Sequence, residues 1–118
     1  MIANVRGSTT GRPIMVLLDF LGRRWAMRIL WELRHGPLTF RALRELCDDV
    51  SPTVLNTRLK ELRALDILQL TPDGYAYTRW GRELAEQMSR LNQWSETWAA
   101  ARTEDEAGGT EETTYHTA

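Results

Sequence analysis

The sequence of 118 residues predicts a mainly α-helical domain with one small β-hairpin. Three observations lead to this prediction. Apolar residues recur at spacings of three and four along several stretches, the period of an amphipathic helix. Two short runs rich in β-formers flank Thr71-Pro72-Asp73-Gly74, a sequence with the chemistry of a tight turn. A long apolar stripe then runs from Trp80 to Trp98.

The first two helices follow from apolar spacing and from residues that stop a helix. The first carries apolar residues at i, i+3, i+4 and i+7 and should end at Gly22: Ile14, Leu17, Leu18 and Leu21. The second is expected over about 24–35. Gly36-Pro37 should stop it, because proline disfavours helix in the residue before it and glycine suits a helix end.

Two capped helices come next. Thr39 can cap a third helix over 40–47, whose inward residues are expected to be Phe40, Leu43 and Leu46/Cys47. Ser51 then caps a fourth helix that reaches about residue 65. Pro52 occupies its first position, where the missing N–H costs nothing.

The chain then changes period. Strands are expected over 67–70 and 75–77, and Thr78 can cap a last helix over about 79–102. Two i,i+4 ion pairs, Arg82–Glu86 and Glu86–Arg90, are expected on the outer side of this helix. Its apolar stripe consists of Trp80, Leu84, Met88, Leu91, Trp94 or Ser95, and Trp98.

Charge divides the chain unevenly. The net charge is −1, but residues 1–100 carry +3 and residues 101–118 carry −4. A mildly basic body is compatible with nucleic-acid binding. We expect three parts: a flexible arm over 1–12, one domain over 13–102, and an acidic, disordered tail over 103–118. No membrane span or secretion signal is recognisable, and one cysteine allows no internal disulfide, so a cytoplasmic location is expected.

The order of the central elements predicts a function. Two helices joined by a short connection and followed by a hairpin form the layout of a winged helix-turn-helix, whose second helix enters the DNA major groove. Steps of about 100° per residue place the leucines of the fourth helix on one side and small polar or basic groups on the other. We expect groove contacts from Ser51, Thr53, Asn56, Thr57 and Lys60, and phosphate contacts from Arg41, Arg44 and Arg58.

Five strings in order resemble the HxlR-type transcriptional regulators, a winged-helix family related in architecture to MarR proteins. They cover about 13–100 and read L-D-F-L-G-R-R-W (18–25), I-L-W-E-L (29–33), G-P-L-T-F-R-A-L-R-E-L (36–46), V-S-P-T-V-L-N-T-R-L-K-E-L (50–62) and Y-x-Y-T-R-W-G-R-E-L (75–84). The resemblance implies a cytoplasmic bacterial regulator that binds double-stranded DNA as a homodimer.

In this family the N-terminal and long C-terminal helices form the dimer. The candidate interface residues are therefore Ile14, Leu17, Leu18, Leu84, Met88, Leu91, Trp94 and Trp98. The abundance of tryptophan agrees with an interface. Two other interpretations remain open: Trp94 and Trp98 close the core of one protomer, or the aromatic residues form a pocket for a planar ligand.

The sequence departs from the family pattern at two places. Many members carry a sensing cysteine before the first helix, directly followed by proline, whereas this chain has Arg12-Pro13 there. Cys47 is interpreted instead as a small core residue, because neighbouring carboxylates raise a thiol pKa. Family wings are usually longer and often basic, so the Asp73 at this tip puts wing contact with DNA in doubt.

Nothing in the sequence supports an enzyme, a cofactor or a metal site. His35 and His116 stand alone without ligand spacing, and no G-x-S-x-G or phosphate loop occurs. The alternative function is an interaction protein that keeps the winged-helix fold but has lost or weak DNA binding. The sequence does not identify a small-molecule effector.

Overall fold

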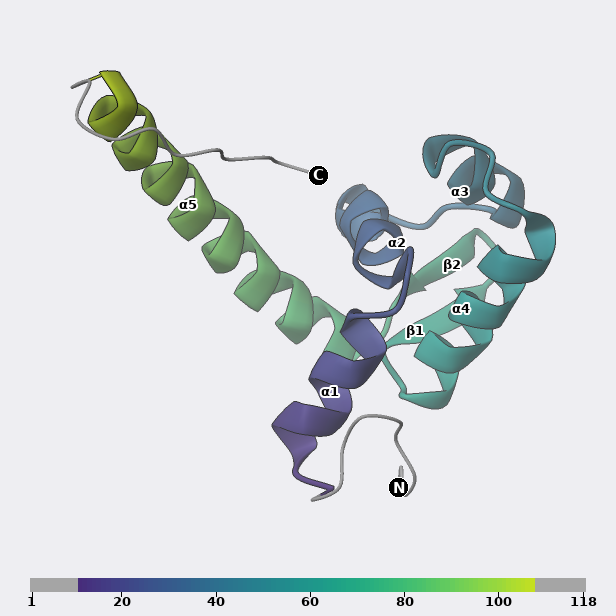
Figure 1. Cartoon of the computed structure of the whole chain (residues 1–118). Coiled ribbons are helices and arrows are strands. Elements are labelled where there is room, and N and C mark those ends of the chain that lie inside the picture. The colour runs from purple at the N-terminus through teal and green to yellow at the C-terminus, as the bar shows by residue number, and fades with distance from the viewer. Residues whose placement is uncertain (1–10, 108–118) are drawn as a thin grey trace. The chain divides into compact units, whose positions relative to one another are not determined.

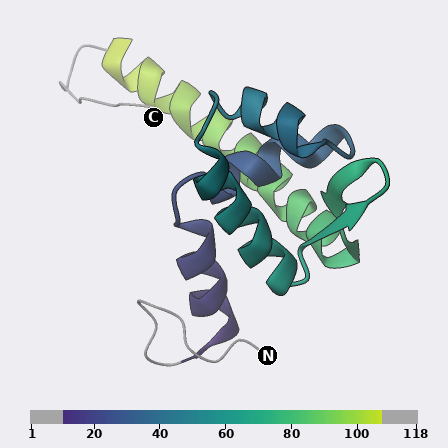
Figure 2. The same cartoon turned by 90° about the vertical axis from the view of Figure 1, so that its right-hand side faces the viewer.

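A computed structural model describes residues 11–107 and confirms a mainly helical fold with a two-stranded hairpin. The described residues divide into two compact units, 11–85 and 86–107. The elements are α1 (Pro13–Leu21), α2 (Ala26–Glu32), the 3-10 helix η1 (Leu33–His35), α3 (Phe40–Leu46), α4 (Pro52–Ala64), β1 (Leu68–Thr71), β2 (Gly74–Tyr77) and α5 (Arg79–Ala107) (Figures 1 and 2).

Three hydroxyl side chains cap the N-termini of helices, as the sequence predicts. The Thr39 Oγ1 accepts a hydrogen bond from the backbone N–H of Ala42, and the Ser51 Oγ accepts one from Val54, each at 3.1 Å. The Thr78 Oγ1 accepts one from the Gly81 N–H at 3.1 Å. Each bond satisfies a backbone donor that the first turn of a helix leaves unpaired.

The second predicted helix is shorter and less regular than expected. It begins at Ala26 because Trp25, its N-cap, has a positive φ of 77° and is not helical. Its last turn tightens into η1 before Gly36. The apolar spacing indicated the helix but could not reveal the left-handed residue at its start.

The hairpin forms where the turn residues predicted it. β1 and β2 pair antiparallel, from Leu68 opposite Tyr77 to Thr71 opposite Gly74. Leu38 adds a bridge that the sequence did not indicate: its N–H donates to the Tyr75 carbonyl at 3.0 Å and its carbonyl accepts from the Tyr75 N–H at 2.8 Å. A Cβ at Gly74, where φ is 118°, would lie 2.4 Å from the Leu38 carbonyl oxygen, so this approach requires glycine.

The core of the first unit comes from every central element. Buried apolar side chains include Ala26, Ile29, Leu30, Leu33, Leu43, Cys47, Leu55, Leu59, Leu62, Ile67 and Leu68. Of the pair Leu46/Cys47, Cys47 is the inward residue. The Leu46 side chain is 43% exposed, whereas Cys47 in the following turn is fully buried.

The last helix extends further than expected. α5 continues to Ala107, so residues 103–107 are helical and not part of a disordered tail. Alanine, arginine and glutamate in A-R-T-E-D-E-A favour helix, and the sequence turns to Gly-Gly only afterwards. The remaining tail and residues 1–10 of the arm lie outside the described residues.

The outer charges of α5 also pair differently. Neither Arg82–Glu86 nor Glu86–Arg90 forms an ion pair, although all three side chains belong to the described part of the chain. Arg79 and Glu83 lie 3.3 Å apart instead. Between residues 11 and 107, no helix has the length and apolar character needed to cross a bilayer.

Replacement of Gly81 by alanine tests the junction between the hairpin and α5. In an ordinary helix this change stabilises by about 0.5–1 kcal/mol. Here the new Cβ would lie 2.2 Å from the Ile67 carbonyl oxygen. We therefore expect Gly81→Ala to lower the free energy of unfolding by about 1–3 kcal/mol in urea titrations. Ser89→Ala at an exposed position of the same helix should cause no loss, and equal values for both variants would contradict the proposed clash.

Candidate nucleic-acid interface

α4 presents opposite chemistry on its two sides. Leu55, Leu59 and Leu62 are buried. The exposed side, which we name the reading face, consists of Ser51, Thr53, Asn56, Thr57 and Lys60. Because the leucines fix the rotation of the helix, the reading face must point away from the core.

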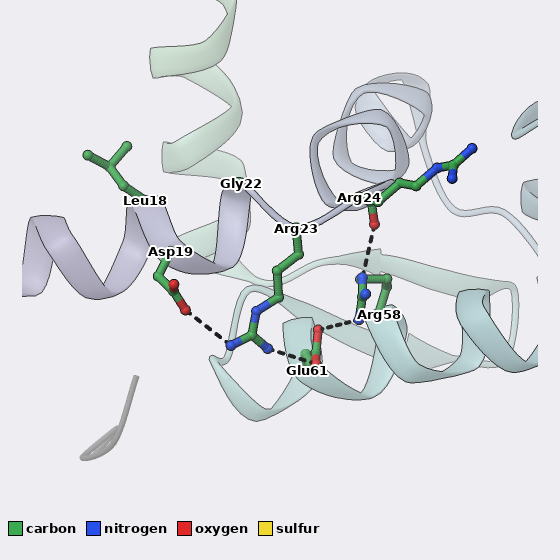
Figure 3. A pocket seen from close by; sticks show the side chains of 7 residues that line it. All are labelled: Leu18, Asp19, Gly22, Arg23, Arg24, Arg58 and Glu61. Atoms are coloured by element: carbon green, nitrogen blue, oxygen red, sulfur yellow. Dashed lines mark hydrogen bonds and ion pairs between the residues drawn. The ribbon is translucent and has the colours of Figure 1, made fainter. Parts of the chain in front are cut away.

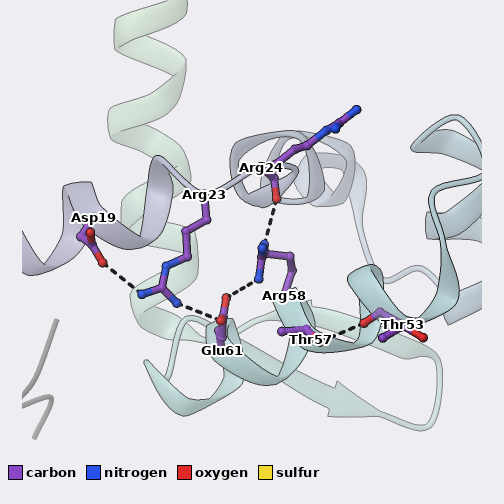
Figure 4. Close-up of polar contacts among 7 residues, drawn as sticks. All are labelled: Asp19, Arg23, Arg24, Thr53, Thr57, Arg58 and Glu61. Atoms are coloured by element: carbon purple, nitrogen blue, oxygen red, sulfur yellow. Dashed lines mark hydrogen bonds and ion pairs between the residues drawn. The ribbon is translucent and has the colours of Figure 1, made fainter. Parts of the chain in front are cut away.

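The reading face retains unused hydrogen-bonding capacity. Asn56 and Lys60 make no side-chain hydrogen bond or ion pair within residues 11–107. Thr57 differs, because its Oγ1 donates to the Thr53 carbonyl at 2.9 Å (Figure 4). Lys60 is the only lysine of the entire sequence. An amide and an ammonium without partners on one exposed face can serve polar edges of another molecule.

Arg58 lies on the flank of α4 and is used within the chain. Its Nε donates to the Arg24 carbonyl at 2.9 Å, and its Nη1 lies 3.1 Å from the Glu61 carboxylate. The side chain is largely buried. The sequence proposed a phosphate contact here, whereas these bonds attach α4 to the turn before α2.

Glu61 connects Arg58 to a second arginine. Its other carboxylate oxygen accepts from Arg23 at 2.8 Å, and Arg23 also binds Asp19 of α1 at 3.1 Å (Figures 3 and 4). We call Asp19, Arg23, Glu61 and Arg58 the Arg23–Glu61 network. It lines a cleft of about 690 Å³. In Figure 3 the guanidinium of Arg24 points away from these bonds.

This network was not recognised from the sequence. A signal was present, because Asp19–Arg23 is an i,i+4 pair and Arg58–Glu61 an i,i+3 pair of opposite charges. The contact that joins them, Arg23 to Glu61, spans 38 positions and depends on the tertiary fold. The structure gives these charges a role in holding α1, the following turn and α4 together.

Two further arginines were expected at phosphates, and they differ in availability. Arg41 of α3 is 90% exposed and, among residues 11–107, pairs only with Glu45, at 3.5 Å. Arg44 is half-buried, and its Nε donates to the Val50 carbonyl at 2.7 Å. That bond spans the turn in which Asp48 and Asp49 both have positive φ. Arg44 thus supports the connection between α3 and α4, and Arg41 remains accessible.

The hairpin tip is closed by its own polar groups and carries no cation. The Thr71 Oγ1 donates to the Gly74 carbonyl at 2.8 Å and accepts from the Asp73 N–H at 3.2 Å. Pro72 and Asp73 are exposed, and the sequence from Asp66 to Thr78 contains neither lysine nor arginine.

Cys47 has the environment of a core residue. Burial raises the pKa of its thiol, Glu32 and Asp48 raise the pKa further, and only Arg28 opposes them. A protonated, inaccessible thiol reacts slowly with oxidants and electrophiles. Residues 11–107 hold no cluster of three histidine, cysteine or acidic side chains that could bind a metal; His116 lies outside them.

The candidate dimer residues leave apolar surface uncovered. On α5, Trp94 is 60% exposed, and its ring stacks on Trp98 at 5.7 Å between centroids. On α1, Ile14 is 56% and Leu18 52% exposed. Leu91 is exposed as well, whereas Leu17, Leu84 and Met88 are partly buried.

Comparison with known proteins places this arrangement among regulators. The family described as HxlR-like helix-turn-helix matches residues 20–103. The uncharacterized HTH-type transcriptional regulator YvaP of Bacillus subtilis is 30% identical over 88 residues, which cover 69% of this chain and 82% of that protein.

Solved structures agree with the fold. The quinone-bound YodB of B. subtilis is 27% identical, covers 71% of this chain and 96% of its own, and has a TM-score of 0.66. A regulator assigned to the MarR family from Enterococcus faecalis V583 has a TM-score of 0.71 over 86% of this chain and 99% of its own. At 23% identity the latter supports the fold alone.

Replacement of Glu61 by glutamine tests the Arg23–Glu61 network. The change leaves two partly buried guanidinium groups without their shared carboxylate. We expect a loss of about 1–2 kcal/mol in the free energy of unfolding, between the values for exposed and for buried ion pairs. Glu45→Gln, which breaks the exposed pair with Arg41, is the matched control and should change stability by less than about 0.5 kcal/mol. Equal effects in urea titrations would mean that the network does not hold α4.

Proposed function

This chain belongs to the HxlR-like helix-turn-helix family, and on that premise we propose that it is a sequence-specific DNA-binding transcriptional regulator located in the cytoplasm. In this proposal it acts as a homodimer and inserts α4 into the major groove. The observation that carries the proposal is the reading face, an exposed row of polar and basic side chains on a helix whose opposite side is buried.

The reading face suits the edges of base pairs. In a helix-turn-helix the N-terminal part of the second helix contacts the bases, and here that part contains Ser51, Thr53, Asn56 and Thr57. Asparagine can bind adenine through two hydrogen bonds, and lysine can donate to guanine. Lys60 lies one turn further along α4 and extends this chemistry.

Phosphate contacts should position the protein on the duplex. Arg41 on the exposed side of α3 is the leading candidate, because a first helix crosses the DNA backbone and this side chain is accessible. Arg44 and Arg58 contribute mainly by holding α4 in place through their bonds to carbonyl groups.

Thiol sensing before α1 is not part of the proposal. The quinone-bound YodB illustrates a structural relative with a bound quinone. This chain has Arg12 before Pro13, and its one cysteine is buried.

Substitutions at Arg41 and Lys60 test DNA binding. We expect Arg41→Gln to weaken binding to selected and random duplexes alike and to reduce the slope of log affinity against log salt by about one. Lys60→Gln should weaken the selected site more than random DNA, by about 1–3 kcal/mol. Fluorescence anisotropy across a salt series measures both effects. Arg90→Gln, an exposed charge loss on α5, is the control.

Chemical labelling supplies an independent measurement. Because Lys60 is the only lysine, an amine-reactive reagent modifies that side chain and the chain terminus alone. Specific DNA should protect Lys60 and leave the terminus reactive. Two results together would favour the alternative function of an interaction protein. The affinity for DNA would show neither salt dependence nor preference over random duplex, and Lys60 would remain reactive in the presence of DNA. The cation-free wing tip is the observation that motivates this alternative.

The homodimer is proposed from the apolar stripe of α5 and the exposed side of α1. Exposed tryptophan and leucine in such number are unusual on a monomer and typical of an interface. We expect sedimentation at micromolar concentration to give a dimer, and Trp94→Glu to shift it to monomer. Gln93→Glu adds the same charge at the neighbouring position and should leave the dimer intact. A wild-type monomer would contradict the proposal.

A further inference from the structure

Two threonines on the reading face present different groups outward. The Thr57 Oγ1 donates its proton to the Thr53 carbonyl at 2.9 Å, one turn earlier in α4 (Figure 4). The hydroxyl of Thr53 makes no hydrogen bond within residues 11–107. Both side chains are exposed. The same residue type thus offers a free hydroxyl at 53, and at 57 a methyl group beside a hydroxyl whose proton is already donated to the backbone.

This difference limits what Thr57 can recognise. Guanine and adenine N7, guanine O6 and thymine O4 are acceptors that need a donor from the protein. The Thr57 hydroxyl can donate to them only by giving up its bond to the backbone. The thymine C5-methyl group needs only an apolar partner, which the Thr57 methyl group provides.

The folding of α4 does not explain Thr57. The side chain is exposed, so its methyl group does not pack in the core. Threonine is a poorer helix former than alanine, glutamate or lysine at an exposed position, because its branched side chain loses freedom. A hydroxyl bonded to the i−4 carbonyl brings little gain to a helix. The methyl group is therefore available for a ligand rather than needed for stability.

We propose that Thr57 is a specificity-determining residue that contacts a thymine C5-methyl group, whereas Thr53 reads the bases through its hydroxyl. This inference rests on the proposed function, because it assigns a base to one residue of the reading face. It predicts a thymine in each half-site opposite the second turn of α4.

Uracil provides the test, since it differs from thymine only in lacking the C5-methyl group. A binding site is first selected from a random duplex library with the full-length chain, and each thymine is then replaced by uracil. At the thymine that Thr57 contacts, we expect affinity of the wild-type protein to fall about fourfold, the loss of one buried methyl group. Thr57→Ser should bind the thymine and uracil sites equally, and Thr57→Val should retain the full preference for thymine.

Thr53 supplies the matched control because it lies on the same face with the opposite chemistry. Thr53→Ser should keep the affinity and Thr53→Val should lose it, and neither change should alter the effect of uracil. Thermal unfolding by circular dichroism checks that the four variants are folded.

The possible failures are distinguishable. A library that yields no enriched site contradicts sequence-specific binding, and the proposed function fails together with this inference. An enriched site at which uracil has no effect, or has the same effect on Thr57→Ser, overturns the inference alone. Loss of binding by Thr57→Val also overturns it, because the hydroxyl would then be the group that contacts the base.

Discussion

The burial of three leucines on one side of α4 is the constraint on which the rest of the candidate interface depends. Leu55, Leu59 and Leu62 each contribute about 1.5–3 kcal/mol when removed from water. A rotation of the helix by one residue would expose these leucines and bring polar side chains of the reading face into the core. The chemistry offered to a ligand is therefore fixed by packing, and substitutions at Thr53, Asn56, Thr57 or Lys60 should alter recognition with little effect on the fold.

Leucine packing fixes the rotation of α4 but leaves its ends free to shift, and polar contacts restrict them. Arg44 holds the carbonyl of Val50 just before the helix. Near the middle of α4, Arg58 donates to the carbonyl of Arg24. In the last turn of α4, Glu61 pairs with Arg23. Through Asp19 the last connection also includes α1, so the position of α4 depends on the helix expected to contribute to the dimer.

Local signals explain why much of the fold could be predicted from the sequence. The apolar period, the Ser51-Pro52 start and the Pro72-Asp73-Gly74 turn act within a few residues, and the structure confirms all three. The reading face followed from the same period. The unpredicted features depend on partners distant in sequence. The bridge from Leu38 to Tyr75 is one of them, and the direction of Arg58 toward Arg24 is another. The sequence does not distinguish an arginine on a helix flank that contacts solvent from one that binds a phosphate or a carbonyl group.

A wing without a cation changes how affinity and specificity are divided in the proposed complex. Phosphate contacts supply most of the sequence-independent affinity for DNA, and each adds to the salt dependence. With Arg44 and Arg58 bound to carbonyls, Arg41, whose side chain is 90% exposed, is the leading cation for that purpose. Base contacts, including an apolar contact at Thr57, are much less sensitive to salt. The complex should therefore be weak on random DNA and should owe an unusually large share of its binding energy to the operator sequence. Two copies of α4 joined through a dimer would then be required, because one short reading face offers too few contacts for stable binding by itself.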